Sequence, residues 1–388
     1  MMRGQIDAEA LAGEGIAALR RGNPAQARRH FEALIEASVP GFPPPWFLLA
    51  QACHQLGDDA GEEAALDRHL AVDTRHLASL LMLGDLKVRT GDTRAASACY
   101  ATARNVATAR PDQVRGQLPA MLDRAAAWQA EQDRLYAARL LDTVAGLPDG
   151  PAGARVRQAI DLLLGRTQLY LQQPSMFYFP GLPQRQYYER DEFAWLPGLE
   201  AAAPDIRAEL LALMREDAPS FMPYVEAVPG RPRPANPLLD DRSWSASYLW
   251  RGGALVEENA TRCPATVAAL EQVPIPRIAG RSPMALFSML RPHTRIQPHH
   301  GMLNTRLICH LPLLVPGDCA LRVGNETRAW REGEAVIFDD SIEHEAWNES
   351  DSIRVVLLFE IWRPELTLDE RAALTRILET VSGYEDGN

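Results

Sequence analysis

The sequence predicts a multidomain protein of mixed α and β structure: an all-α helical repeat domain comes first, and an antiparallel β-domain with flanking helices follows. Three observations predict this class. The first 170 residues are rich in Ala, Leu, Arg and Glu and poor in β-branched residues, which is typical of helices. Within them Gly22, Gly57 and Gly91 recur at spacings of 35 and 34 residues. From residue 283 onward, short apolar or alternating runs follow one another as strands do.

Composition limits the classes of function. The 388 residues suggest two or three domains of about 150 residues each. A net charge of −11 argues against nucleic acid or anionic lipid as the main partner, because both need a clustered basic face. The five cysteines lack CxxC spacing, so neither a disulfide framework nor a zinc site is expected. Neither a signal peptide in residues 1–19 nor an apolar run of about 18 residues is present, so we expect a cytoplasmic protein without a membrane span.

The helical part repeats around its glycines. A small residue is expected five positions after each glycine and a large one nine positions after it; the residues there are Ala27, Glu62 and Ala96, then Phe31, Leu66 and Tyr100. This pattern resembles the tetratricopeptide repeat, although Glu62 stands at a usually small position. Helical patterns at 113–146 and 153–170 would cap three stacked helix pairs, giving a repeat domain over 1–171. A generic helical bundle is the alternative.

The second domain is expected over 172–388. Gly324-Asn325 between two strand-like runs fits a two-residue type II′ turn. Thr367 and Glu370 form a capping box that predicts a last helix over 367–381, after an earlier helical stretch at 203–216. Close strands without intervening helices predict an antiparallel sandwich or barrel. The expected strands cover residues 284–290, 304–315, 320–323, 326–330, 335–338 and 353–362.

Histidines gather in the β-domain. Five of the nine lie within residues 293–344: His293, His299, His300, His310 and His344. A single histidine here is more often structural than a ligand. The cluster as a whole, however, is the usual material of a transition-metal site. His299 and His344 lie 45 residues apart, each expected just after a strand, and could converge in a closed sandwich.

Arg354 stands in a strand that is apolar on both faces and therefore buried on both. A buried guanidinium needs an anion, because it cannot lose its proton and its desolvation is costly. Either a structural Asp or Glu pairs with it, or it binds the carboxylate of a ligand.

Several motifs in the second half of the chain resemble those of a known enzyme family. The segment 298–366 resembles the catalytic domain of the aspartyl/asparaginyl β-hydroxylase family, a branch of the iron(II) and 2-oxoglutarate dioxygenases. Looser matches, including residues 179–182, extend the resemblance back to residue 172. The matching blocks are His299 to Asn304, His310-Leu, Gly324 to Arg328, Trp330, Glu332-Gly333, Phe338-Asp-Asp-Ser341, Glu343 to Trp347 and Trp362 to Leu366. The resemblance implies a double-stranded β-helix of the jelly-roll or cupin type.

The resemblance also implies the site. His299 and His344 would hold iron(II), without the carboxylate that most dioxygenases carry two positions after the first histidine, where this chain has Gly301. Asp340 would either hold a water on the metal or cap a turn. For 2-oxoglutarate, Arg354 and Ser288 would bind the far carboxylate, and His310 would lie near the chelating end.

One departure concerns position 308. Family members commonly carry an arginine nine residues after the first iron histidine, and this chain has Ile308. Arg306 lies on the same face of the expected strand and is a candidate substitute. The aromatic residues Phe177, Tyr178, Tyr187, Tyr188 and Trp195 either pack in the core or line a substrate entrance.

The resemblance implies hydroxylation of aspartyl or asparaginyl β-carbons in a peptide or protein that the helical repeats help to present, with dioxygen consumed and succinate and carbon dioxide released. Two alternatives stay open. One is the same chemistry on a lipid or small metabolite. The other is a scaffold whose β-domain is degenerate.

Overall fold

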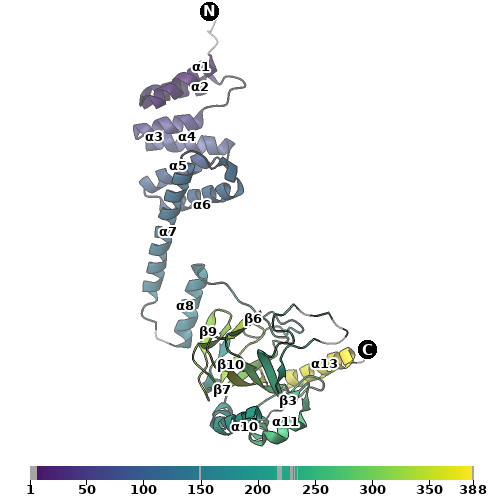
Figure 1. Cartoon of the computed structure of the whole chain (residues 1–388). Helices are drawn as coiled ribbons and strands as arrows, with labels where there is room; N and C mark the ends of the chain where they lie inside the picture. Colours follow the sequence, from purple (N-terminus) through teal and green to yellow (C-terminus); the bar gives the residue numbers. More distant parts are fainter. Residues whose placement is uncertain are drawn as a thin grey trace, which may run out of the picture. The chain divides into compact units, whose positions relative to one another are not determined.

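The computed structural model describes residues 7–147, 150–215, 221–227, 230, 232–233 and 235–386. It divides into two compact units, residues 1–160 and 161–388 (Figure 1). The first is helical, and the second is built around antiparallel β-sheets. Within the described residues, no helix is both long and apolar enough to cross a membrane.

The helical unit begins with three packed helix pairs, and two further helices follow them. Acidic or amide side chains at Asp7, Asn23, Asp58 and Asp92 accept a backbone N–H at the start of α1, α2, α4 and α6, as helix N-caps do. The helices are α1 (Ala8–Arg20), α2 (Pro24–Ala37), α3 (Trp46–Leu56), α4 (Asp59–Val72), α5 (Leu77–Arg89), α6 (Thr93–Ala109), α7 (Leu118–Thr143) and α8 (Pro151–Leu163), with a short 3₁₀ turn at Pro111–Gln113.

The predicted repeat pattern is observed in the packing. The three spaced glycines have φ of +72°, +70° and +84°, and each lies in the turn between the two helices of a pair. Gly15 and Gly84 let the helices approach closely, because an added Cβ would lie 2.5 Å from the Phe31 ring and 2.4 Å from the Tyr100 ring. Three helix pairs of the predicted type are therefore present.

Glu62, which departs from the repeat pattern, is buried between neighbouring helices. His54 Nδ1 lies 3.1 Å from Glu62 Oε2, and the Arg89 guanidinium donates to the same oxygen at 2.7 Å. The carboxylate therefore connects α3, α4 and α5, and its partners make the burial of its charge tolerable.

The boundary of the second unit lies before the predicted one at 171/172. Helix α8 ends at Leu163 rather than near residue 170, because Gly165 takes a left-handed backbone conformation. Thr167 then donates to Asn325 Oδ1 at 2.5 Å, and Tyr170 packs against the sandwich core. Residues 161–171 therefore belong to the β-containing unit.

Two antiparallel sheets form this unit. The larger has the order β1-β10-β7-β12-β5-β3-β2, with β4 beside β3, and the smaller has the order β6-β11-β8-β9. The strands are β1 (Tyr187–Tyr188), β2 (Met222–Pro223), β3 (Trp244–Arg251), β4 (Ala254–Leu255), β5 (Ala285–Leu290), β6 (Thr294–His299), β7 (Arg306–Leu314), β8 (Cys319–Val323), β9 (Glu326–Ala329), β10 (Val336–Phe338), β11 (His344–Asn348) and β12 (Arg354–Trp362). The two sheets form the predicted jelly-roll sandwich.

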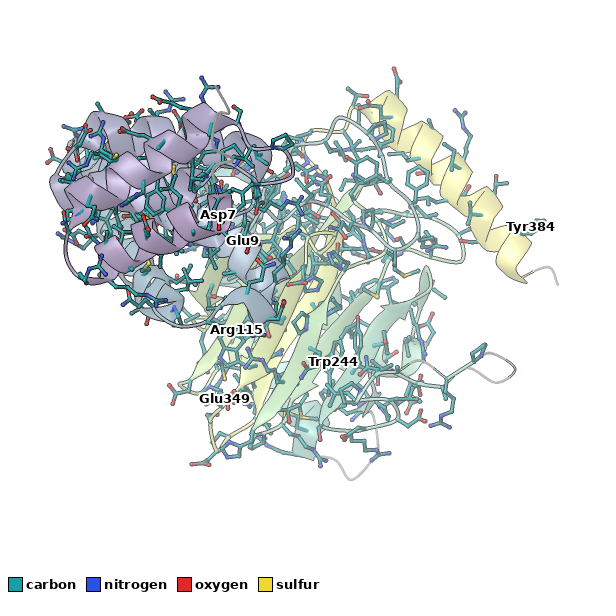
Figure 2. All side chains as sticks on the ribbon, turned by 90° about the horizontal axis from the view of Figure 1, so that it is seen from above. Asp7, Glu9, Arg115, Trp244, Glu349 and Tyr384 are labelled. Carbon is teal, nitrogen blue, oxygen red and sulfur yellow. The ribbon has the colours of Figure 1, made fainter. Side chains whose placement is uncertain are left out.

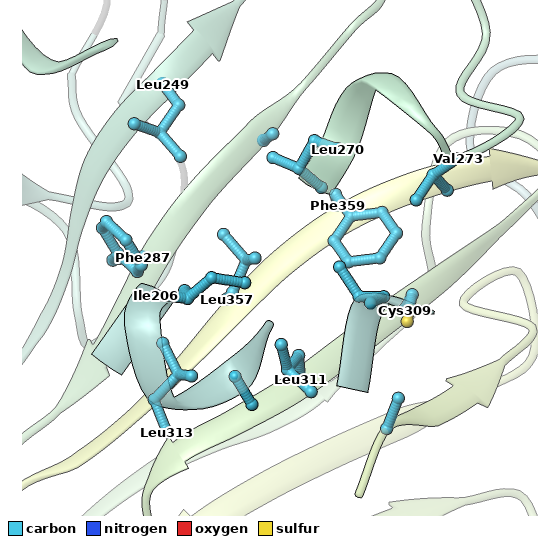
Figure 3. Packing of buried hydrophobic residues seen from close by; sticks show 14 of the residues in the cluster. Ile206, Leu249, Leu270, Val273, Phe287, Cys309, Leu311, Leu313, Leu357 and Phe359 are labelled. Carbon is cyan, nitrogen blue, oxygen red and sulfur yellow. The ribbon is translucent and has the colours of Figure 1, made fainter. Parts of the chain in front are cut away.

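The larger sheet separates two cores. On one face, side chains such as Leu286, Val356 and Phe338 pack with Leu321 and Ala346 of the smaller sheet. The opposite face packs against helices, as Figure 3 shows for Ile206 and Leu270 over Phe287, Leu357 and Phe359. The helices of this unit are α9 (Leu196–Ala201), α10 (Ala203–Arg215), α11 (Glu257–Arg262), α12 (Pro264–Glu271) and α13 (Leu368–Asp386), with a 3₁₀ turn at Arg190–Glu192.

All six predicted strand regions are strands, and the Gly324-Asn325 turn has a positive φ at its glycine, as type II′ requires. The Thr367–Glu370 capping box is formed, with Glu370 Oε2 accepting from Thr367 N at 2.8 Å. Strands β1, β2, β3, β4, β6 and β11 lie outside the predicted regions. The sequence of β6 contains a proline and exposed polar residues, and β11 is short, so neither shows a clear period of two.

Candidate functional site

The predicted metal-binding and cosubstrate-binding residues line one cavity of about 640 Å³ in the β-containing unit. Its wall combines residues of both sheets, so the sandwich itself brings together segments distant in the chain. Trp244, which Figure 2 labels, also belongs to this wall. The predicted residues that line it are Ser288, His299, Arg306, His310, Asp340, His344 and Arg354.

His299 and His344 converge as predicted, although they lie within strands rather than after them. His299 ends β6, His344 begins β11, and the two are direct cross-strand partners. Their ring centres are 4.1 Å apart. A register shift follows His344 in the pairing, which is a common feature of strands beside functional sites.

Hydrogen bonds fix the tautomers of both rings. His299 Nδ1 lies 2.8 Å from Gln297 O, and His344 Nδ1 lies 3.0 Å from Ile342 O. A carbonyl only accepts, so each Nδ1 carries the hydrogen and each Nε2 keeps its lone pair. Desolvation lowers the pKa of His299, and burial with the neighbouring His299 lowers the pKa of His344 to about 3. Both imidazoles are therefore neutral, and the Nε2 of each is available to bind a metal.

The donor set fits a metal that takes two protein ligands. Among the described residues, no group of three or more His, Cys, Asp or Glu side chains is arranged to hold an ion. A metal at His299 and His344 would therefore complete its coordination with non-protein ligands. Imidazole nitrogen suits iron among other transition metals.

Asp340 occupies the space that a side chain at position 301 would need. A Cβ on Gly301 would lie 2.1 Å from Asp340 Oδ2, and Gly301 N donates to Asp340 O at 2.6 Å. The carboxylate missing two positions after His299 is thus replaced in space by one from Asp340. Its Oδ1 is buried and has no hydrogen-bond partner among the described residues, and burial raises the pKa of Asp340 to about 6.

Arg306 is paired with two carboxylates. It forms ion pairs with Glu360, which is fully buried, and with Asp340 Oδ2 at 3.3 Å. It does share a face of β7 with Ile308 and His310, as predicted, and all three line the cavity. Because both of its terminal nitrogens are engaged, we expect Arg306 to hold Asp340 rather than to replace an arginine at 308. The sequence analysis missed Glu360, although a lone carboxylate in an apolar strand was a visible signal.

Arg354 has no acidic partner within the part of the chain that the structure describes. Its Nη1 donates only to Ser288 O, at 3.4 Å, its Nε has no hydrogen-bond partner, and its guanidinium lies 4.7 Å from the centre of the Trp330 ring. Burial lowers the pKa of Arg354 to about 10. Of the two interpretations of this arginine, the structural partner is not found, and the carboxylate-binding one stays a prediction.

His310 lies deep in the same cavity. It packs edge-on against Phe338 at 5.0 Å between ring centres, and its buried Nδ1 has no hydrogen-bond partner among the described residues. Burial, together with the charges of Arg354 and His344, holds its pKa well below the usual range, so it is neutral. The other two histidines of the cluster differ: His300 lines the cavity wall, and His293 is exposed beside Asp351.

Of the two interpretations of the aromatic residues, packing in the core or lining a substrate entrance, the structure favours packing for most of them. Tyr187 and Tyr188 are buried in the two cores, and Trp195 packs against the helix-covered one. Phe177 is partly buried, Tyr178 is exposed, and none of the five lines the cavity. All of them except Tyr178 therefore contribute to packing.

With the geometry established, comparison with known proteins gives the family. Residues 200–364 match the family described as "Aspartyl/asparaginyl beta-hydroxylase". Most of the second unit is therefore similar to this hydroxylase family. Residues 13–74 match the tetratricopeptide repeat, which confirms the second resemblance. The hydroxylase domain therefore follows a tetratricopeptide-repeat region in this chain.

The curated proteins similar to this region are named after different activities or after the domain alone. The human "Aspartyl/asparaginyl beta-hydroxylase" is 33% identical over 209 residues, which are 53% of this chain and 26% of that protein. "Aspartate beta-hydroxylase domain-containing protein 2" of Xenopus tropicalis is 32% identical, over 53% of this chain and 55% of that protein. The "Ornithine lipid ester-linked acyl 2-hydroxylase" of Rhizobium tropici is 35% identical, over 46% and 60%. The chain thus spans less than two thirds of each.

Solved structures are more distant. A Pseudomonas putida prolyl-4-hydroxylase aligns over 42% of this chain and 88% of its own, with 14% identity and a TM-score of 0.26. A Cupin 2 conserved barrel domain protein from Salinispora arenicola aligns over 38% and 98%, with a TM-score of 0.22. The assignment of the jelly-roll fold therefore depends on the sheet order described above.

Proposed function

We propose that this protein is an iron(II)- and 2-oxoglutarate-dependent dioxygenase that hydroxylates the β-carbon of aspartyl or asparaginyl residues in a peptide or protein. Succinate and carbon dioxide would be the co-products. One observation carries the proposal. The same cavity is lined by two neutral imidazoles, whose Nε2 lone pairs are free, and by a buried guanidinium that has no carboxylate partner among the described residues. That pairing suits a metal and a dicarboxylate cosubstrate together.

Each side chain has a role in this proposal. His299 and His344 hold the metal, and their Nδ1–H bonds to backbone carbonyls keep the rings oriented. Arg354 and the Ser288 hydroxyl bind the far carboxylate of 2-oxoglutarate, for which a planar guanidinium is well suited. Neutral His310 lies near the chelating end. When bound, iron with 2-oxoglutarate and dioxygen supplies the oxidising chemistry, and the protein supplies orientation and water exclusion.

The Asp340 carboxylate lies beside Gly301. Its carboxylate is held by Arg306, and Arg306 is held by Glu360. We propose that Asp340 orients a water on the metal, where most dioxygenases in the class would place a carboxylate ligand.

The helical unit would present the substrate. Stacked helix pairs form surfaces that suit extended chains, which supports a peptide or protein partner. The five cysteines are unpaired, which supports a reducing compartment such as the cytoplasm.

Succinate formation tests this proposal. Purified protein with iron(II), 2-oxoglutarate and dioxygen should form succinate slowly without substrate, and His344→Ala should form none. Peptides containing aspartyl or asparaginyl residues should then accelerate the reaction and gain one oxygen atom by mass spectrometry. No succinate and no metal-dependent 2-oxoglutarate binding by the wild type would favour the scaffold alternative.

A second candidate keeps the chemistry and changes the substrate to a lipid acyl chain. The relative named as an acyl hydroxylase favours it, and so do the apolar cavity residues Leu238, Met284 and Met302. One assay that measures both products distinguishes the two candidate substrates. A hydroxy fatty acyl product in the absence of any peptide hydroxylation would select the lipid.

A further inference from the structure

One short segment of the chain, residues 172–179, is bonded to the loops beside both histidines of the site, and we call it the entry segment. Gln173 N donates to Ser341 O at 2.7 Å, in the turn that leads into β11. Ser175 N donates to Gly301 O at 2.9 Å, in the loop that follows β6. The entry segment therefore bridges the two loops through its backbone.

The side chain of Gln172 contacts both loops at once. Its Nε2 donates to Asp339 Oδ2 at 2.7 Å, and its Oε1 accepts from Asn304 Nδ2 at 3.0 Å. All three side chains are buried. Asn304 lies five residues after His299, and Asp339 lies five residues before His344. One carboxamide thus connects the loops that carry the two proposed metal ligands.

The carboxamide of Gln172 has a single possible orientation. Its Nε2 also donates to Pro183 O at 2.9 Å, and its Oε1 also accepts from Gln184 Nε2 at 3.2 Å. A glutamine amide has two donors and two acceptor lone pairs, so all four are used here. Exchanging its oxygen and nitrogen would place a donor against the amide of Asn304 and an acceptor against the carboxylate of Asp339. The spacing of the two loops is therefore set within the fold.

Each of the two loops is also held by bonds of its own. Asn304 Oδ1 accepts from Phe179 N at 2.7 Å, and Asp339 Oδ1 accepts from Ser341 N at 3.0 Å. Loss of the Gln172 amide would therefore leave each loop formed and would let one shift against the other.

This spacing is important because the site has few protein ligands. Among the described residues, no third His, Cys, Asp or Glu side chain joins His299 and His344 in an arrangement that could hold a metal. A metal bound by two side chains depends on their relative placement, since no further ligand can compensate for an error.

We propose that Gln172 is a positioning residue for the metal: it fixes the distance between the loops that carry His299 and His344. This inference rests on the proposed function, in which the two histidines bind iron, and it adds a residue outside the predicted set. Gln172 acts through Asn304 and Asp339 and makes no contact with the metal itself.

Mn²⁺ titration of the full-length protein, with free Mn²⁺ measured by electron paramagnetic resonance, tests the inference without turnover. Gln172→Met keeps the length of the side chain and removes the amide, so Mn²⁺ affinity should fall about 10-fold or more, as for residues that orient metal ligands. Gln184→Met is the matched control, because Gln184 is exposed and its side chain bonds to Gln172. Its Mn²⁺ affinity should equal that of the wild type.

The visible absorption spectrum of the Co²⁺-loaded protein separates positioning from a general loss of stability. The spectrum depends on coordination geometry, so it should change in Gln172→Met and stay unchanged in Gln184→Met. Circular dichroism establishes a temperature at which both variants are folded. A purely structural role would lower the unfolding temperature of Gln172→Met and leave the spectrum of the folded protein as it is.

Hydrogen exchange on the unmutated chain covers the case in which Gln172→Met folds poorly. If the entry segment orders the metal site, then metal binding must in turn stabilise the entry segment. Mn²⁺ should therefore slow the exchange of the Gln173 and Ser175 amide hydrogens, measured by mass spectrometry, more than it slows exchange in α10.

Equal Mn²⁺ affinity in Gln172→Met and Gln184→Met would overturn the inference, and so would an unchanged Co²⁺ spectrum or unchanged exchange in the entry segment. A wild type that binds no Mn²⁺ overturns the proposed function as well. Normal wild-type binding with an unaltered Gln172→Met site overturns only this inference.

Discussion

Two buried arginines stand at the two ends of β12, and their surroundings differ completely. Arg363, just after the strand, donates to Asp339 Oδ2 at 2.7 Å, to Pro183 O at 2.9 Å and to the Tyr188 hydroxyl. Arg354, the first residue of the strand, has one long bond to a carbonyl and the face of an indole. The pKa of Arg363 is raised by its acidic partners, and that of Arg354 is lowered by burial.

The difference separates structure from function. A buried charge is stable when its hydrogen bonds are made within the fold. Arg363, at the end of β12, is bonded in this way to Pro183 and to Asp339. A buried charge whose donors are unused costs free energy in the absence of a ligand, which is a reason to expect one. Arg354 is therefore the arginine that we assign to cosubstrate binding.

The largest expected effect is on stability. Arg363→Met leaves Asp339 buried without its cation, so we expect a loss of about 3–5 kcal/mol in the free energy of unfolding. Arg354→Met removes a charge that has no counterion, so it should be neutral or stabilising without ligand. Urea unfolding followed by tryptophan fluorescence measures both. Equal losses in the two variants would show that the comparison is wrong.

The next effect is on 2-oxoglutarate binding, where we expect Arg354 rather than Arg363 to have the larger effect. Arg354→Met should weaken 2-oxoglutarate binding by about 30-fold to several thousand-fold, the usual range for removing one partner of a buried charge pair. Calorimetry on the Mn²⁺-loaded protein gives the dissociation constants, with Arg322→Met, in an ionic cluster with Glu343 and Glu345, as the control. Unchanged affinity in Arg354→Met would require another cation for the carboxylate.

Asp339 and Asp340 are adjacent residues that each pair with an arginine, but only Asp340 lines the cavity. Asp339 is paired with Arg363, whereas Asp340 lies against Gly301 in the cavity. Gly301→Ala should therefore cost about 1–3 kcal/mol through overpacking against the Asp340 carboxylate. Adding Asp340→Ala should recover much of that loss. A Gly301→Ala protein as stable as the wild type in thermal unfolding would mean that Asp340 moves freely.

The sequence predicted the components of this site better than their connections. His299, His344 and Arg354 were identified because imidazoles in a cluster and a cation in an apolar strand are unusual. Their partners were not: Trp244 lies 44 residues before Ser288, and Glu360 lies 54 residues after Arg306. Such pairs depend on which strands become neighbours and in what register, and the periodicity within one strand does not specify either. The helical repeats were easier, because local contacts define them.

The smallest effect extends the comparison to the helical unit. His76 caps α5 by accepting from Ser79 N at 3.2 Å, its ring lies 4.5 Å from that of His69, and His69 Nε2 is buried without a partner among the described residues. Burial lowers the pKa of both histidines, although nearby Asp73 opposes the shift.

Because the folded pKa values lie below the unfolded value of about 6.5, the unfolded chain binds protons more readily. These groups therefore contribute their stability in full above that value, and the contribution is lost as the pH falls below it. The slope should be at most about 1.4 kcal/mol per pH unit for each histidine, and smaller for partly exposed rings. Thermal unfolding between pH 7.5 and 5, followed by far-ultraviolet circular dichroism, measures it. His76→Asn keeps a cap acceptor and removes one titrating group, so its curve should be flatter; an unchanged slope would assign the pH dependence to other groups.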